Sequence, residues 1–577
     1  MLRSERWVGG LNVSGLLHRA SLRAGGAREA GGGKPIVGIC NSWSELVHCN
    51  VHLRATAHAV KRGVLEAGGV PVEFPTISLS ENLMKPTAML YRNLMAMDVE
   101  EMIRSHPLDA VVLLGSCDKT VPAQLMGAIS AGVPAIMLTG GPSDPAHFRG
   151  RELGVGTDLW HYTDDVRAGR MSMEDYAELE AALIPTHGHC NEMGTAATMA
   201  SLCEALGIAL PGTALLPAVD AARADAAIRT GARAVELARD GIAPRALLSA
   251  AALDNAIAVL MAIGGSTNAV VHLLALAGRL GIELPLERFA AISARTPLLV
   301  NARPSGEYLT DAVHRAGGIP AVMAELGDLL DREAPTVTGR SLAAELAGRG
   351  TLDDAVIARR ERPFEPRGAI TTLRGNLAPR GAVIKRSAAS PELLAHRGPA
   401  VVFDGIEDLL ARFDDPELPV SADSVLVLRG VGPRGAPGMP EWGMLPIPSR
   451  LLRAGVTDMV RISDARMSGT AYGTVVLHAA PEAAVGGPLA LVRDGDPIVL
   501  DVDAGLIALD VPDDVLAARS PAPVAPAATG RRGYTQLYQR HVLQADQGCD
   551  FDFLLPASED GDPTVPPGLF DGWVAGW

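Results

Sequence analysis

Three cysteines share one local setting, a polar loop just before a helix-like run of residues: Cys49, Cys117 and Cys190. Cys117 is the clearest case, because a strand-like apolar run over residues 109–114 precedes it and a helix-like run over 121–131 follows it. In open α/β folds, ligands bind at the loops that leave the carboxyl ends of strands. A helix N-terminus also lowers the pKa of a thiol, which favours the metal-binding thiolate. The pattern therefore predicts a buried metal centre.

The spacing of these cysteines leaves a second interpretation open. They lie about 70 residues apart and form no CxxC pair. Buried cysteines often serve as small hydrophobic side chains. We expect that simpler role for Cys40, which ends a strand-like run, for Cys203, which lies within an apolar helix-like run, and for Cys549 near the C-terminus.

Carboxylates beside turns suggest a second cation. Glu81, Asp118 and Glu441 each lie in such a loop, and hard cations such as magnesium take oxygen ligands. Lys119 is unusual in this company, because an ammonium repels a metal whereas a lysine carbamate would supply an oxygen ligand. Taken singly, each carboxylate could equally be a solvated group or a helix cap, and Lys119 could form a salt bridge with Asp118.

A serine lies in a glycine-bounded turn over residues 464–473, directly after a strand-like run at 458–462. Such a turn presents the Ser468 hydroxyl and nearby amides to a ligand. Chemistry alone favours the plainer interpretation, an ordinary turn into a helix with a serine cap. The chain has no GxSxG elbow, so a hydrolase nucleophile is not supported.

The elements that must position these groups alternate between strand-like and helix-like runs. An α/β domain with a mostly parallel sheet is therefore predicted for residues 1–367. Strands are expected at 35–39, 70–79, 109–114 and 134–138, and helices at 50–67 (capped by Asn50), 92–105, 121–131, 191–206, 253–263 and 267–280.

From about residue 373 the pattern changes to short β-rich runs separated by turns. These runs predict a second domain over 368–577, built on a β-barrel or sandwich. A linker is expected at 359–367 and an extended connector at 520–529. The strands expected in this part are 400–403, 424–428, 458–462, 474–477, 497–502 and 506–511.

Composition narrows the class of protein. The chain has 577 residues, enough for two or more domains, and a formal net charge of −15. That charge argues against general nucleic-acid binding, and an anionic substrate would have to be drawn by local positive charge. No apolar run of about 18 residues suggests a membrane span, the N-terminus has no signal core, and six cysteines favour a reducing compartment. A cytoplasmic enzyme acting on a small molecule is expected.

Seven segments resemble the dihydroxy-acid and sugar-acid dehydratase family (IlvD/EDD), and they occur in order between about residues 3 and 555. The resemblance implies an α/β N-terminal domain, a β-barrel-like C-terminal domain and a site between them. The segments are residues 38–50, 86–92, 115–120, 186–194, 264–268, 435–441 and 467–470.

The resemblance also implies roles for individual residues. A two-iron two-sulfur cluster would be held by Cys49, Cys117 and Cys190. Magnesium would be bound by Glu81, Asp118, Glu441 and a carbamylated Lys119, which belongs to the catalytic centre. Ser468 would act as the base, as an alkoxide, and Thr470 would help to hold the substrate.

The implied reaction is a dehydration. Magnesium would clamp the substrate carboxylate and C2 oxygen, and the open iron position would take the C3 hydroxyl as leaving group. Ser468 would remove the C2 proton, and the resulting enol would tautomerise to a 2-keto-3-deoxy acid. A serine titrates far above neutrality, so nearby cations must help.

Within the family, residues 190–193 and 467–472 are similar to the pentonate branch, which acts on acids such as L-arabinonate and D-xylonate, and so are residues 532–538 and 544–553. A sugar-acid dehydratase, forming a homodimer or homotetramer, is therefore expected. His48 departs from the Pro or Thr that often precedes the cluster cysteine, which could alter the surroundings of the cluster.

Two other functions remain open. One is the dihydroxy-acid dehydratase of branched-chain amino-acid biosynthesis, which more usually has Cys-Gly-Gly-Met and Arg-Phe-Ser-Gly at the two motifs. The other is a non-catalytic metal-binding or ligand-sensing relative. A phosphorylated substrate is disfavoured, since no additional basic phosphate cradle is evident.

Overall fold

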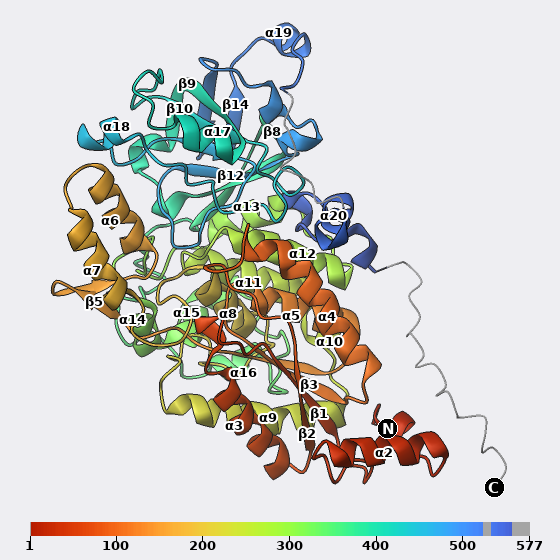
Figure 1. The fold of residues 1–577 in the computed structure, drawn as a ribbon. Helices are drawn as coiled ribbons and strands as arrows, with labels where there is room; N and C mark the ends of the chain where they lie inside the picture. Colours follow the sequence, from red (N-terminus) through yellow and green to blue (C-terminus); the bar gives the residue numbers. More distant parts are fainter. Residues whose placement is uncertain (1, 523–531, 557–577) are drawn as a thin grey trace.

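The computed structural model describes residues 2–522 and 532–556. An α/β body forms one end of the molecule and a barrel the other, with a layer of helices between them (Figure 1). The connector expected at 520–529 falls largely outside the described residues.

The α/β body is built on a parallel sheet with the strand order β2-β1-β3-β4. The strands are β1 (Ile36–Asn41), β2 (Val70–Pro75), β3 (Ala110–Gly115) and β4 (Ala135–Thr139). Strands β1, β3 and β4 are buried along their whole length, as expected when helices cover both faces. Helices α3 (Leu53–Glu66) and α9 (Ala222–Asp240) pack together on the sheet, and so do α4 (Arg92–Ser105) and α5 (Thr120–Ala131). The predicted parallel sheet is confirmed.

The predicted start of the first long helix is wrong. Helix α3 begins at Leu53, and Asn50 ends a short 3-10 turn, η1 (His48–Asn50). The amide of Asn50 donates to Ser42 O (2.9 Å) and Ser78 Oγ (3.0 Å), and its Oδ1 accepts from Cys117 N at 3.3 Å. Asn50 therefore joins two loops of the sheet rather than capping the helix, because these long-range partners satisfy its amide group.

A layer of apolar helices connects the sheet to the barrel. These are α8 (Thr195–Ala205), α11 (Ala250–Ala262), α12 (Asn268–Leu280), α13 (Leu286–Arg295) and α15 (Gly318–Leu326). The largest core cluster runs from Ile36 in β1 through this layer to Val475 and Leu477 of the barrel. The core of the α/β domain therefore extends to the barrel, which also has two core clusters of its own.

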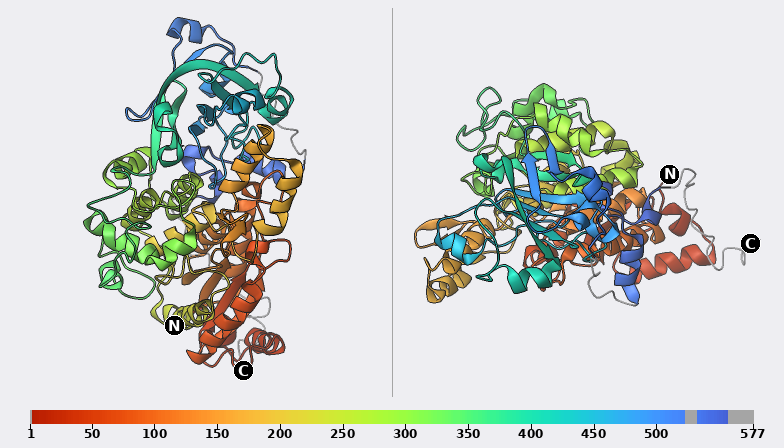
Figure 2. Two further views of the ribbon diagram at one scale, coloured as in Figure 1. Left: turned by 90° about the vertical axis from the view of Figure 1, so that its left-hand side faces the viewer. Right: turned by 90° about the horizontal axis from the view of Figure 1, so that it is seen from above.

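The second domain is a closed barrel with the strand order β10-β11-β12-β8-β7-β14-β13-β9. Figure 2 shows this domain, coloured in green-blue to blue, from two further sides. The alternative of an open sandwich is excluded. Strands β7 and β8 lie where no strand was expected, because Pro379 and three glycines interrupt the alternating pattern of apolar residues. The pairing is irregular as well, with one register shift between β8 and β12 and one between β8 and β7. The strands are β7 (Ile370–Gly375), β8 (Ala378–Lys385), β9 (Ala395–Asp404), β10 (Val425–Arg429), β11 (Arg461–Ser463), β12 (Val475–Ala480), β13 (Pro497–Asp501) and β14 (Leu506–Leu509).

Two further segments bridge the domains. The hairpin of α6 (Thr157–Arg167) and α7 (Met173–Leu183) projects beside the barrel, and α20 (Gly533–His541) lies against the junction (Figure 1). The remaining elements are α1 (Glu5–Val8), α2 (Val13–Ala24), β5 (Ala146–Phe148), β6 (Arg151–Leu153), α10 (Pro244–Leu247), α14 (Thr310–Arg315), α16 (Leu342–Leu346), α17 (Gly405–Arg412), α18 (Ser449–Arg453) and α19 (Asp513–Ala517), with short 3-10 turns between them.

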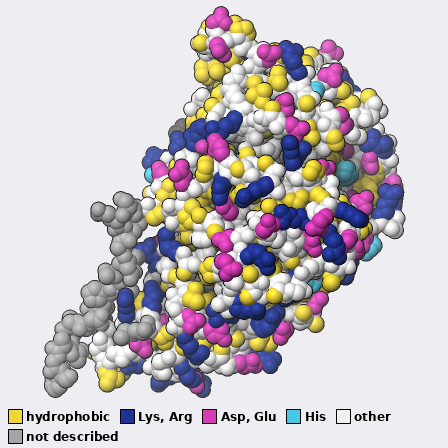
Figure 3. Space-filling view, turned by 180° about the vertical axis from the view of Figure 1, so that it is seen from behind, with side chains coloured by type: hydrophobic (Ala, Val, Ile, Leu, Met, Phe, Trp, Pro, Cys, Tyr) yellow, Lys and Arg dark blue, Asp and Glu magenta, His cyan; other side chains and the backbone are white. Residues whose placement is uncertain are grey.

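Acidic and basic side chains are intermingled over the face seen in Figure 3, which has no continuous basic surface. Within residues 2–522 and 532–556, no helix is both long and apolar enough to cross a membrane.

Candidate metal centre and active site

The loops that leave neighbouring parallel strands bring the first group of predicted residues together. Cys117, Asp118 and Lys119 follow β3 directly and precede α5, while Cys49 lies between β1 and α3. Glu81 lies in the loop after β2. Because the carboxyl ends of parallel strands share one edge of a sheet, residues far apart in sequence meet there.

The barrel supplies the second group across the domain junction. Glu441 lies in the long loop after β10, and Ser468 and Thr470 lie in the loop between β11 and β12. Thr195 opens helix α8, five residues after Cys190. The candidate site is thus built from both domains, with the sheet edge on one side and barrel loops on the other.

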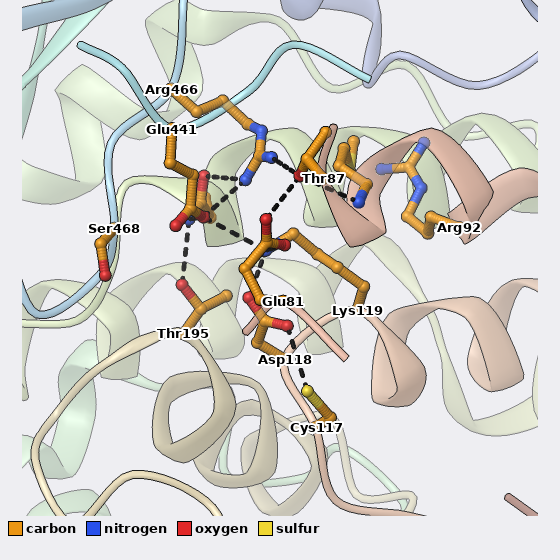
Figure 4. Close-up of polar contacts among 12 residues, drawn as sticks. Glu81, Thr87, Arg92, Cys117, Asp118, Lys119, Thr195, Glu441, Arg466 and Ser468 are labelled. Carbon is orange, nitrogen blue, oxygen red and sulfur yellow. Dashed lines mark hydrogen bonds and ion pairs between the residues drawn. The ribbon is translucent and has the colours of Figure 1, made fainter. Parts of the chain in front are cut away.

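Three carboxylates converge around one lysine (Figure 4). Oxygen atoms of Glu81, Asp118 and Glu441 all lie within 4.8 Å of one another. Lys119 Nζ lies 3.3 Å from both Glu81 Oε2 and Glu441 Oε1, and it also pairs with Asp118. The side chain of Lys119 is fully buried. Four charged groups therefore share a small volume, in which the lysine is buried and the three carboxylates are partly exposed.

In this cluster, burial and neighbouring charges shift the pKa of each group in opposite directions. Burial alone would lower the pKa of Lys119, but Asp118, Glu441 and Glu81 outweigh it and raise that pKa. Burial raises the pKa of Glu81, whereas Lys119 and Arg466 overcome the effect of burial on Glu441 and lower its pKa. An unmodified Lys119 is therefore an ammonium that neutralises its neighbours.

The donor set suits a hard cation. Glu81 Oε2 is buried and accepts no hydrogen bond. In the described part of the chain its one polar contact is the ion pair with Lys119 Nζ, so this oxygen is available as a metal ligand. Carboxylate oxygens are the ligands that magnesium prefers. An ammonium could not join them as a ligand, but a carbamate on Lys119 would add an oxygen and replace the positive charge with a negative one.

Sequence reasoning assigned no role to the residues that hold this cluster in place. Arg466 Nη1 donates to Glu441 Oε1 (2.8 Å) and to Asn268 Oδ1 (3.0 Å), and its Nη2 donates to Thr87 Oγ1 (3.1 Å). Thr87 in turn donates to Glu81 Oε1 at 2.6 Å. Thr87, Asn268 and Arg466 lie in or beside the family-like segments given above, so the sequence marked their positions. Only the fold shows which groups they contact.

The thiols form a separate buried group beside the carboxylates. Cys49 and Cys117 pack together with Val47, and Cys190 lies close enough to contribute to the raised pKa of Cys49. Cys117 Sγ lies 3.5 Å from Asp118 Oδ1, which links the two groups. No disulfide forms, since all six cysteines are free. Three neighbouring thiols without a disulfide are a donor set that fits an iron–sulfur cluster or another metal that binds thiolates.

The expected lowering of the thiol pKa is wrong for two of these cysteines in the protein without metal. The Cys117 thiol and burial raise the pKa of Cys49, and burial raises the pKa of Cys190. The short η1 turn beside Cys49 contributes little helix dipole, and desolvation exceeds the effect expected of a helix N-terminus. A bound cation would have to supply the charge that stabilises the thiolates.

The turn that carries Ser468, here called the serine turn (residues 464–473), packs against the N-terminus of helix α8. Ser468 Oγ and Thr470 Oγ1 are 2.9 Å apart. A Cβ added at Gly469 would lie 2.7 Å from Thr195 Oγ1 and 2.8 Å from Ser266 Oγ, so the backbone approaches this helix closely. Asn268 Nδ2 donates to both Met467 O (3.1 Å) and Glu441 Oε1 (3.0 Å), which ties the turn to the carboxylates. The plainer expectation of a serine capping a helix is wrong, since a strand, β12, follows the turn.

A groove of about 1100 Å³ lies elsewhere on the α/β body, between α2 and the edge strand β2. Its lining includes Trp7, Trp43 and Arg54 but none of the predicted site residues. The candidate site is therefore the domain junction and not this groove.

A cluster of partly buried carboxylates, a group of thiols and a hydroxyl-bearing turn between an α/β domain and a closed barrel define a candidate metal-dependent enzyme site. The chain belongs to the dihydroxy-acid/6-phosphogluconate dehydratase family, a family of hydro-lyases. The N-terminal model of this family matches residues 34–345, and the C-terminal model matches residues 355–549.

Curated relatives match almost end to end. The chain is 51% identical to an L-arabonate dehydratase of Azospirillum brasilense, over 96% of this chain and 97% of the relative. It is 48% identical to a 6-deoxy-6-sulfo-D-gluconate dehydratase of Pseudomonas putida, over 98% of each. A dihydroxy-acid dehydratase of Ignicoccus hospitalis is 41% identical over 93% of this chain and 98% of the relative.

Proposed function

We propose that the protein dehydrates a sugar acid, an aldonate of the pentonate class, to its 2-keto-3-deoxy acid. The observation that carries the sugar-acid class is the identity to two relatives named for sugar acids. Those that act on L-arabonate or a sulfogluconate are 51% and 48% identical, against 41% for a relative that acts on a dihydroxy acid. The motifs around Cys190 and Ser468 point the same way.

We further propose the cofactors that the donor sets fit. Cys49, Cys117 and Cys190 would hold a two-iron two-sulfur cluster. Glu81, Asp118, Glu441 and a carbamylated Lys119 would hold magnesium. When bound, these groups would supply Lewis acidity that weakens the C2–H and C3–O bonds of the substrate.

The residues of the chain would carry the proton transfers and the binding. Ser468 Oγ, as an alkoxide, would take the proton from C2. The C3–O bond would break, the leaving hydroxide would take the proton held by Ser468 Oγ and depart as water, and the enol would lose its hydroxyl proton and gain one at C3 to give the keto acid. Thr470 Oγ1, 2.9 Å from Ser468 Oγ, would orient this base and contact the substrate.

The first experiment is an assay of the anaerobically purified protein with magnesium on several acids: L-arabinonate, D-xylonate, D-gluconate, 6-deoxy-6-sulfo-D-gluconate and 2,3-dihydroxyisovalerate. Formation of a 2-keto acid from a pentonate at the highest kcat/KM is expected. Turnover of dihydroxyisovalerate alone would replace the proposal with the branched-chain reaction. No turnover by protein that contains iron, sulfide and magnesium would favour the non-catalytic relative.

We also propose a cytoplasmic homodimer or homotetramer. The free state of all six cysteines supports a reducing compartment. Sedimentation of the purified protein tests the assembly, and a monomer at assay concentration would contradict it.

A further inference from the structure

His48 lies beside the thiols, and its ring faces a sulfur. His48 Nε2 lies 3.4 Å from Cys49 Sγ. Both residues belong to η1, between the end of β1 and the start of α3. Cys49 is only 5% exposed, so few groups can reach its sulfur.

The other histidines near the thiols each make a ring contact that does not involve sulfur. His189 Nδ1 lies 2.9 Å from the Cys190 carbonyl oxygen, and His52 Nε2 lies 2.9 Å from Gly140 O. His187 stacks on His52, with ring centroids 4.8 Å apart. Among the hydrogen bonds of residues 2–522 and 532–556, only that of His48 joins a histidine ring to a cysteine sulfur.

The chemistry of a metal-bound thiolate fixes the direction of this contact. Such a sulfur carries no proton and can only accept, so the nitrogen that faces it must carry the hydrogen. A neutral imidazole can present Nε2–H and keep Nδ1 as an acceptor. Hydrogen bonds to the sulfurs are among the properties that set the reduction potential of an iron–sulfur cluster.

We propose that His48 donates an Nε2–H···Sγ hydrogen bond to the Cys49 thiolate of the cluster, raising the reduction potential of the cluster and slowing its loss of iron. The inference rests on the proposed cofactor. His48 is a positioning residue, because it contacts a cluster ligand and not the substrate. The physical reason is that the donated hydrogen draws electron density from the sulfur, which favours the reduced cluster and holds the ligand in place.

The test compares four proteins, each purified anaerobically: the wild type, His48→Phe, His48→Gln and His187→Phe. The phenylalanine variant keeps a planar ring without a donor, and glutamine restores an N–H group. His187→Phe is the matched control, since it can keep the stacking on His52 without touching a sulfur. The readouts are iron and sulfide content, reduction potential by dye-mediated titration, rate of iron release to a chelator, and pulsed EPR of the reduced cluster.

His48→Phe is expected to show a more negative potential and an iron affinity lower by roughly tenfold, the low end for outer partners of metal ligands. His48→Gln should recover most of both values, and His187→Phe should match the wild type. Unchanged potential and iron release in His48→Phe would overturn the hydrogen bond. Strong nitrogen coupling in the wild type that His48→Phe abolishes would also overturn it, because His48 would then bind iron directly. A wild-type protein that contains no iron or sulfide would overturn the proposed cofactor together with the hydrogen bond. A wild-type protein that contains the cluster but responds to no His48 substitution would overturn the hydrogen bond alone.

Discussion

At the residue scale, the site consists of buried charges that only other site residues can neutralise. Lys119 is surrounded by three carboxylates, and Arg466 supports one of them from behind. A buried charge that loses its partner costs more than the pair contributes, so these residues depend on one another. The serine turn differs, because the Ser468 hydroxyl is hydrogen-bonded to the side chain and the backbone nitrogen of Thr470 and to no charged group in the described residues.

Ser468→Ala should lower kcat by roughly 100- to 10,000-fold, the range for removing a general base. The iron content and visible absorbance should stay at wild-type values, because Ser468 contacts none of the thiols. Steady-state assays together with iron analysis check this. Ser387→Ala is the matched control, since Ser387 bonds to Ser305 at 2.8 Å, away from the carboxylates, and should keep its activity. Wild-type turnover by Ser468→Ala would remove Ser468 as the base.

Lys385→Met should stabilise the fold in a pH-dependent way. The amine of Lys385 is buried at the end of β8 without a hydrogen-bond partner, and burial lowers its pKa from 10.5 to about 7. Between these values the unfolded chain holds a proton that the folded chain lacks, so wild-type stability rises with pH across this window and the burial cost is complete below it. The advantage of the methionine variant should therefore be largest near or below neutral pH, a few kcal/mol at most, and should fade toward about pH 10.

Urea denaturation of the wild type and Lys385→Met at about pH 6 and about pH 9.5 measures this difference. Lys34→Met provides the control, because Lys34 is exposed and pairs only with Glu29 at the surface. An advantage of Lys385→Met that did not shrink with pH would show that the amine is not the cause.

At the element scale, helix α6 fixes the active-site turn from outside the sheet and the barrel. Thr157 Oγ1, in the first turn of α6, donates to Thr470 O at 2.9 Å. Glu192 accepts hydrogen bonds from Gly156 N (2.8 Å) and Thr157 N (2.6 Å), which ties the start of α6 to the segment that carries Cys190. Helix α6 thus couples the serine turn to the thiol loop.

Gly156→Ala should disturb catalysis through Thr470. A Cβ at Gly156 would overlap Thr470 Oγ1 and lie 2.8 Å from its Cγ2, so the threonine must move. Overpacking of this kind costs about 1–3 kcal/mol, and kcat should fall at least tenfold with the iron content retained. At Gly32 an added Cβ meets nothing closer than 3.7 Å, so Gly32→Ala is the control for assay and melting temperature. Normal kcat in Gly156→Ala would mean that the position of Thr470 does not limit turnover.

At the scale of the whole molecule, the C-terminal segment ties the two domains together. Arg92 Nη2 donates to Gly548 O (2.8 Å) and Cys549 O (2.9 Å), and Arg279 pairs with Asp550. On the barrel side, the amide nitrogen of Glu482 donates to Gln544 Oε1 at 2.9 Å. Helices α4 and α12 and the barrel are therefore held by one short stretch of chain.

Asp550→Ala should destabilise the protein by about 3 kcal/mol, because it leaves Arg279 buried without its main counter-ion. Both side chains are fully buried, and Glu100 Oε2, 3.2 Å from Arg279 Nη1, would compensate only in part. Urea denaturation gives the difference. Asp552→Ala removes an ion pair with His541 that is half exposed, so this control should cost less than about 1 kcal/mol. Equal losses in the two variants would contradict a special role for Asp550.

The sequence by itself determined the elements and the chemistry within single loops. Helix α4 lies at 92–105 as expected, and the other predicted helices and strands are present with ends that differ by a few residues. Cys117, Asp118 and Lys119 could be recognised together because they are adjacent in the chain. Such features depend on near neighbours and on local hydrophobic pattern, which a linear sequence contains in full.

Only the tertiary structure decided which distant groups meet and what charge they feel. Glu441, Arg466 and Asn268 reach the sheet edge from loops and a helix that no local pattern connects, and β7 and β8 close the barrel despite an irregular sequence. The raised pKa of Cys49 has the same origin. Burial and long-range electrostatics sum over residues hundreds of positions apart, so they exist only once the chain has folded.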